Sequence, residues 1–105
     1  MSKPRYDWWG YIKAVIRRYP ELKGREVSGI ALREKEAVEA AIAATERMQN
    51  GRDRLEVVDR VFWKKTHTLS GAALMVPCGY ETAKRWQQQF IKQVARSLKC
   101  DGLID

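Results

Sequence analysis

The stretch that decides the fold runs from Thr68 to Leu98 and reads TLSGAALMVPCGYETAKRWQQQFIKQVARSL. A short apolar helix is predicted over Leu69–Val76, because its alanines and its valine recur at the spacing of one helix face. The following Pro-Cys-Gly should end that helix, since proline resists continuing a helix and glycine accepts the backbone of a tight turn. A second helix is predicted from Tyr80 onward. Its buried stripe recurs in steps of three and four residues, at Ala83, Trp86, Phe90, Val94 and Leu98.

Two helices joined by a tight turn, the second of them basic, are typical of a helix-turn-helix that sets its second helix into the DNA major groove. Lys84 and Arg85 can donate to guanine there, and Gln88 can pair with adenine. The predicted contacts on this helix are Tyr80, Glu81, Thr82, Lys84, Arg85 and Gln88. Phosphate contacts are predicted for Lys64, Lys65, Thr68 and Ser70, because the first helix of such a motif crosses the DNA backbone.

The rest of the chain predicts three further helices and no strand. Apolar residues recur at helical spacing over Asp7–Tyr19, Leu32–Met48 and Asp53–Lys65. Pro20 is expected to end the first helix and Asn50-Gly51 the second, with a loop over Glu21–Gly29. Asp7 and Thr68 are candidate N-caps. The predicted fold class is therefore all-α, a small domain of four to five helices with a C-terminal helix-turn-helix.

A chain of 105 residues is long enough for one hydrophobic core, so a single domain is expected over residues 1–105. Residues 1–51 would hold an aromatic-rich and an alanine-rich helix, and residues 52–99 the DNA-binding region. Trp63 is interpreted as an aromatic anchor between helices rather than a base-stacking residue. Trp8 and Trp9 point about 100° apart on a helix, so one of them should be exposed or lie at an interface.

The net charge of +7 is unevenly distributed. Residues 64–99 hold seven Lys or Arg against one acid, and residues 3–18 hold five against one, while residues 19–63 are almost neutral. Both basic segments would attract a phosphate backbone, most strongly at low salt. Double-stranded DNA is therefore the expected partner.

The sequence offers no pattern typical of an enzyme, a metal site or a cofactor site. Cys78, Cys100 and His67 lack metal-ligand spacing, and Cys78 is expected to be a small core residue. The three glutamates Glu34, Glu36 and Glu39 are expected on a solvated helix surface, without a nucleophile beside them. No apolar run approaches the roughly 20 residues of a membrane span. A cytoplasmic protein with reduced thiols and no membrane partner is the expectation.

The run ALMVPCGYETAKR resembles the helix-turn-helix of sigma factor region 4. Ala73 takes the small buried position, and Cys78 takes the apolar position just past the turn. The triplet Thr82-Ala83-Lys84 matches the Thr-x-Lys near the start of the recognition helix. The chain departs from the pattern at Pro77, where glycine is usual, and at Gly79, where a capping hydroxyl is common.

The whole chain also resembles the ArpU and RinA families of prophage transcription regulators, because an aromatic-rich YDWWGYIKAVIRRYP segment precedes a sigma-like motif. This resemblance implies activation of late phage genes through sequence-specific DNA binding. Two alternatives remain open: a DNA-packaging module like a small terminase subunit, and a sigma-like module that binds RNA polymerase through Trp8, Trp9 and Trp63. One recognition helix usually gives modest affinity, so a homodimer or a polymerase partner is expected.

Overall fold

The computed structural model describes residues 8–64, 68–76 and 78–100, with side chains through residue 98. These residues form five α-helices, one π-helical turn and no strand. The helices are α1 (Trp9–Lys23), α2 (Gly29–Glu46), α3 (Gly51–Val58), α4 (Leu69–Met75) and α5 (Tyr80–Cys100), and the π-helical turn η1 (Asp59–Trp63) continues α3. The predicted all-α fold class is confirmed.

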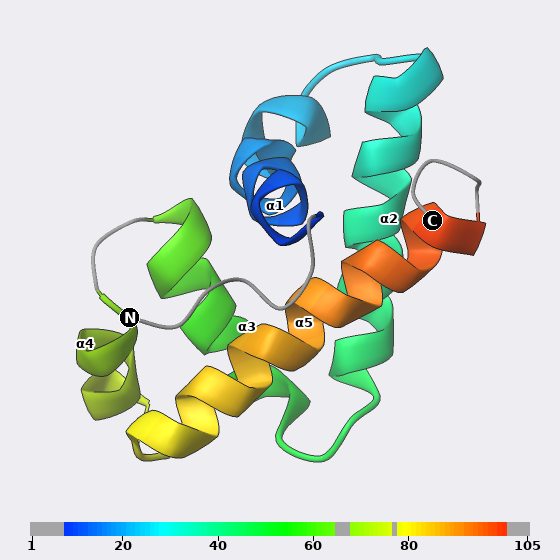
Figure 1. Cartoon of the computed structure of the whole chain (residues 1–105). Helices are drawn as coiled ribbons and strands as arrows, with labels where there is room; N and C mark the ends of the chain where they lie inside the picture. The colour runs from blue at the N-terminus through cyan, green and yellow to red at the C-terminus, as the bar shows by residue number, and fades with distance from the viewer. Residues whose placement is uncertain (1–7, 65–67, 77, 101–105) are drawn as a thin grey trace.

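Helix α5 connects the two parts of the molecule. In Figure 1 it runs diagonally, from a yellow beginning next to α4 to an orange-red end that lies in front of α2. Helix α4 contacts α3, η1 and α5, and among the described residues it makes no contact with α1 or α2. As a result, α4 and the beginning of α5 form one end of the molecule.

The larger hydrophobic core lies between α1, α2, the α3–η1 segment and the second half of α5. Its buried members are Ile12, Val15, Ile16, Tyr19, Ala37, Val38, Ala41, Val58, Phe62, Phe90, Ile91, Val94, Ala95 and Leu98. Burying a side chain as large as Phe62 or Phe90 contributes about 1.5–3 kcal/mol. The predicted apolar stripe of the last helix is confirmed, because all five of its residues are buried.

A smaller core joins α4 to the first half of α5. It contains Val57, Ala72, Ala73, Val76, Ala83 and Trp86. The alanines keep the two helices close together around the single large side chain of Trp86. The predicted N-cap of α4 is confirmed, because the hydroxyl oxygen of Thr68 accepts a hydrogen bond from the Gly71 amide at 3.1 Å.

The prediction that Pro20 ends the first helix is wrong, because α1 continues to Lys23. Proline has no N–H to donate to the carbonyl four residues earlier, which belongs to Ile16. The indole nitrogen of Trp63 donates to that oxygen instead, at 2.8 Å. The connection between α1 and α2 is correspondingly shorter than the predicted loop.

The second helix also begins and ends earlier than predicted, at Gly29 and Glu46. Asn50 does adopt the left-handed conformation (φ 60°), but Gly51 is the first residue of α3 rather than a helix end. A Cβ atom at Gly51 would collide with the carbonyl oxygens of Thr45 and Glu46. This tight approach of α3 to the end of α2 therefore requires glycine.

The third predicted helix, Asp53–Lys65, is not a continuous α-helix. It widens at η1, where the Lys64 amide donates to the Asp59 carbonyl, five residues back, at 2.7 Å. Phe62 is buried in the turn, and its neighbour Trp63 is half-buried. Lys65, His67 and the candidate cap Asp7 lie outside the described residues.

Glu34 is buried, which corrects the prediction that it is a solvated surface charge. Only 5% of the residue is exposed. The Tyr11 hydroxyl donates to its carboxylate at 2.6 Å, and Arg18 donates to both carboxylate oxygens at 3.2 Å. A buried charge is tolerated when it is paired and hydrogen-bonded in this way. Tyr11 itself is 37% exposed, and its hydroxyl lies against the Glu34 carboxylate.

Candidate nucleic-acid interface

The first half of α5 presents a polar face opposite its contact with α4. Ala83 and Trp86 are buried against the smaller core, whereas Lys84, Arg85 and Gln88 are exposed. Residues three and four apart lie on the same side of a helix, so Gln88 sits in line with both basic residues. Glu81 is exposed in the first turn, where its carboxylate complements the positive helix end.

The edges of this face are formed by Tyr80 and Thr82. Gly79, with φ +80°, takes the left-handed backbone that precedes α5. Tyr80 follows it with 46% of its surface exposed. The Thr82 hydroxyl accepts a long hydrogen bond of 3.5 Å from Arg85, which draws the guanidinium toward the beginning of the helix.

The residues predicted to contact phosphate divide into two groups. Thr68 and Ser70 are both exposed at the beginning of α4. Lys64 lies at the end of η1, where its ammonium forms an ion pair with Asp59 at 3.0 Å, so part of its charge is neutralised within the protein. Lys65 lies outside the described residues.

Arg54 is a basic residue beside this face that the sequence did not single out. Its Nε donates to the Gln49 carbonyl at 2.9 Å, and its Nη1 donates to the side-chain oxygen of Gln89 at 2.6 Å. The same guanidinium lies 5.5 Å from the centroid of the Trp86 ring. These contacts fix the Arg54 side chain against α5.

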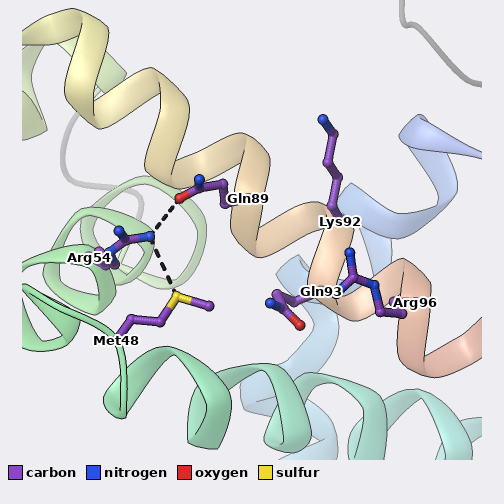
Figure 2. Close-up of a pocket in the computed structure, with 6 residues that line it drawn as sticks. All are labelled: Met48, Arg54, Gln89, Lys92, Gln93 and Arg96. Atoms are coloured by element: carbon purple, nitrogen blue, oxygen red, sulfur yellow. Dashed lines mark hydrogen bonds between the residues drawn. The ribbon is translucent and has the colours of Figure 1, made fainter.

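A pocket of about 250 Å³ opens beside Arg54, between the α2–α3 connection, α3 and α5. Figure 2 shows Met48 and Gln89 converging on Arg54, while Gln93 and Arg96 lie further along α5. The lining residues are Met48, Arg54, Gln89, Lys92, Gln93 and Arg96. They include three cations and no acid. The sequence already indicated part of this pocket. Steps of four, three and four residues place on one side of the helix Arg85, Gln89, Lys92 and Arg96.

Trp8, Trp9 and Trp63 all pack against the larger hydrophobic core. Trp8 and Trp9 are both half-buried against the larger core, with ring centroids 5.8 Å apart, so neither is the fully exposed residue that was predicted as one possibility. Trp63 packs edge-on against Phe90 of α5 at 6.2 Å and lies 5.7 Å from the Tyr19 ring. Its predicted role as an aromatic anchor between helices is confirmed.

Cys78 is partly exposed and packs against the smaller core. Burial, with a smaller effect of the nearby Asp53 charge, raises the pKa of its thiol, which lowers the fraction present as the reactive thiolate near neutral pH. Among the described residues, no three His, Cys, Asp or Glu side chains are grouped to hold a metal ion.

Helix α5 therefore carries an exposed basic face on its first half and borders a basic pocket with its second half. In the described part of the chain, no helix has both the length and the apolar character to cross a membrane. No protein-family model matches the sequence, and no curated protein or solved structure is significantly similar to it.

Proposed function

We propose that this chain binds double-stranded DNA through the first half of α5 and acts as a transcription regulator of the helix-turn-helix class. The observation that carries the proposal is the exposed face with Lys84, Arg85 and Gln88, whose opposite side is fixed to α4 by a small buried core. Arginine and lysine donate to guanine, and glutamine pairs with adenine, which are the usual direct contacts in the major groove.

The position of this face in the molecule supports the same proposal. The major groove is about 12 Å wide and admits one α-helix. Helix α5 begins at the end of the molecule formed with α4, away from α1 and α2 (Figure 1). The net charge of +7 would attract DNA over a distance and accelerate association at low salt.

The proposal is tested by fluorescence anisotropy with short duplex DNA over a salt series. Wild type is compared with Lys84→Ala/Arg85→Ala and with a matched control, Lys23→Ala/Arg25→Ala. The control removes two exposed charges at the connection between α1 and α2. We expect steep salt dependence for wild type and the control, and clearly weaker binding for the α5 variant. Equal binding by both variants, or no binding by wild type at low salt, would overturn the proposal.

The DNA sequence that the protein prefers is determined by selecting duplexes from a random library with the wild-type protein. The resemblance to the ArpU and RinA families suggests that the selected site lies upstream of phage genes. Expression of a reporter gene placed downstream of that site then shows whether the protein activates or represses transcription.

A second candidate function, binding a protein such as RNA polymerase, is favoured by exposed apolar side chains next to the DNA-facing end. Leu74 is 85% exposed and Met75 56%, and both lie at the end of α4, close in sequence to Tyr80. The tryptophans first considered for such a contact are half-buried against the core instead. Co-purification of RNA polymerase with wild type but not with Leu74→Glu would support this function.

A further inference from the structure

The pocket between the α2–α3 connection, α3 and α5 is rich in hydrogen-bond donors. Arg54 uses Nε and Nη1 for contacts within the protein, whereas its Nη2 has no acceptor among the described residues. Gln89 accepts from Arg54 through its oxygen, so its amide N–H groups remain as donors. Lys92 and Arg96 form no hydrogen bond or ion pair with any described residue.

The charge of the pocket selects the class of ligand. Three of its six lining residues are cations and none is acidic, so the volume of about 250 Å³ has no counter-ion among the residues that line it. Arg54 is already held in place by the Gln49 carbonyl, Gln89 and the Trp86 ring, so little side-chain entropy would be lost when it binds an anion. Arginine and lysine together with amide N–H groups form a typical environment for phosphate.

We propose that this pocket binds a phosphate group, and that its natural source is the DNA backbone flanking the bases contacted by α5, a source that rests on the proposed function. Arg96 lies eleven residues beyond Arg85, or about 16 Å along the helix axis. That distance exceeds the width of the major groove, about 12 Å, so the second half of α5 leaves the groove next to a backbone strand. Free phosphate offers the same chemistry to the pocket.

The first arm of the test uses inorganic phosphate alone. Wild-type protein is titrated with sodium phosphate against sodium chloride of equal ionic strength, and backbone amide shifts are followed by NMR. We expect saturable shifts centred on residues 89–96. They should be lost in Gln89→Glu, which keeps an acceptor for Arg54 but adds a negative charge to the pocket. Arg96→Gln should weaken them, and the control Arg25→Gln, in the connection between α1 and α2, should leave them unchanged.

The second arm measures duplex affinity from 50 to 200 mM salt for wild type, Arg96→Gln and Arg25→Gln. Loss of one phosphate contact lowers the slope of log affinity against log salt by about 0.9. The ratio of wild-type to Arg96→Gln affinity should therefore be about 3.5-fold larger at 50 mM than at 200 mM salt. Arg25→Gln should follow wild type.

The two arms separate the pocket from the proposed function. Phosphate shifts without duplex binding by wild type would overturn DNA binding but support the phosphate site. Phosphate shifts with duplex binding but an unchanged Arg96→Gln slope would assign free phosphate as the source. A reduced Arg96→Gln slope supports the backbone source whether or not free phosphate binds detectably. Duplex binding by wild type, with no pocket shifts and equal slopes for both variants, would overturn the phosphate site and leave the proposed function standing.

Discussion

The indole nitrogen of Trp63 donates a hydrogen bond of 2.8 Å to the carbonyl oxygen of Ile16. That oxygen is the one whose helical donor is missing, because position 20, four residues later, is a proline. Ile16 is fully buried, so an unpaired carbonyl there would cost about 1–3 kcal/mol. One side chain from η1 therefore allows α1 to continue past a proline.

This relationship predicts an energetic coupling between positions 20 and 63. Trp63→Phe removes the donor but keeps an aromatic ring against Phe90 and Tyr19. In the Pro20→Ala background the new Ala N–H can bond to Ile16, so Trp63→Phe should cost about 1–2 kcal/mol less there than in wild type. Urea unfolding of wild type, the two single variants and the double variant measures the difference. Additive effects would show that the indole contributes through packing alone.

A second prediction concerns the turn between α2 and α3. Gly51→Ala would push a methyl group into the backbone carbonyls of Thr45 and Glu46, which cannot move as a flexible side chain could. A loss of about 1–3 kcal/mol in the free energy of unfolding is expected. Gly10→Ala is the matched control, since nothing lies within 4 Å of its Cβ position in α1. It should stabilise the protein by about 0.5–1 kcal/mol. Equal effects at both positions would contradict the close approach.

Alkaline pH should weaken the fold through Tyr11. Burial, followed by the hydrogen bond and charge of Glu34, raises the pKa of Tyr11 from 10.0 to about 12. The folded protein thus holds the phenol proton more tightly than the unfolded chain does. This contribution is fully present below pH 10 and is lost as the pH rises toward 12. The stability difference between wild type and Tyr11→Phe should therefore shrink over that range in urea unfolding. A constant difference would contradict the raised pKa.

Helical periodicity was sufficient to predict that these segments are helices, because the buried residues of each helix recur mostly at steps of three and four. Periodicity was not sufficient where a residue distant in sequence changed the end of a helix or the burial of a side chain. Pro20 ends a helix in isolation, but Trp63 supplies the missing donor from 43 positions away in the sequence. Glu34 looks like a surface charge until Tyr11 and Arg18 of the neighbouring helix are placed against it.

The same limit applies to the candidate site. The exposed face of α5 could be predicted, because all its residues lie on one helix. The pocket could be predicted only in part. Lys92 and Arg96 follow the α5 repeat, but Met48 and Arg54 come from other elements, and nothing in local spacing brings them to Gln89. Tertiary packing alone determines that contact.

Two substitutions of Thr68 should distinguish its contribution to stability from its contribution to DNA binding. Thr68→Ala removes the cap of α4 and should cost about 1 kcal/mol in thermal or urea unfolding. Thr68→Asp keeps a good N-cap, so its stability should remain close to wild type. Its negative charge should nevertheless weaken duplex binding if this position faces phosphate. Full duplex affinity in Thr68→Asp would exclude Thr68 from the DNA interface, and Ser70→Asp provides the matched change two residues along the same helix.

Breaking the ion pair between Lys64 and Asp59 should raise DNA affinity, in contrast to the loss expected for Thr68→Asp. Asp59→Asn keeps the backbone carbonyl that accepts from the Lys64 amide, so η1 should remain intact. The carboxylate that now neutralises the Lys64 ammonium at 3.0 Å is removed. Because more than half of the Lys64 side chain is exposed, stability should fall by no more than about 1 kcal/mol.

If Lys64 contacts a phosphate, releasing it should raise duplex affinity and steepen the salt dependence of Asp59→Asn, whereas Lys64→Gln should lower both. Glu26→Gln is the control, because it removes one exposed acid from the connection between α1 and α2 and changes the net charge equally. An increase confined to Asp59→Asn assigns Lys64 to the DNA interface, since long-range attraction depends on net charge and would raise both variants alike. Equal increases in the two variants would instead restrict the interface to α4 and α5.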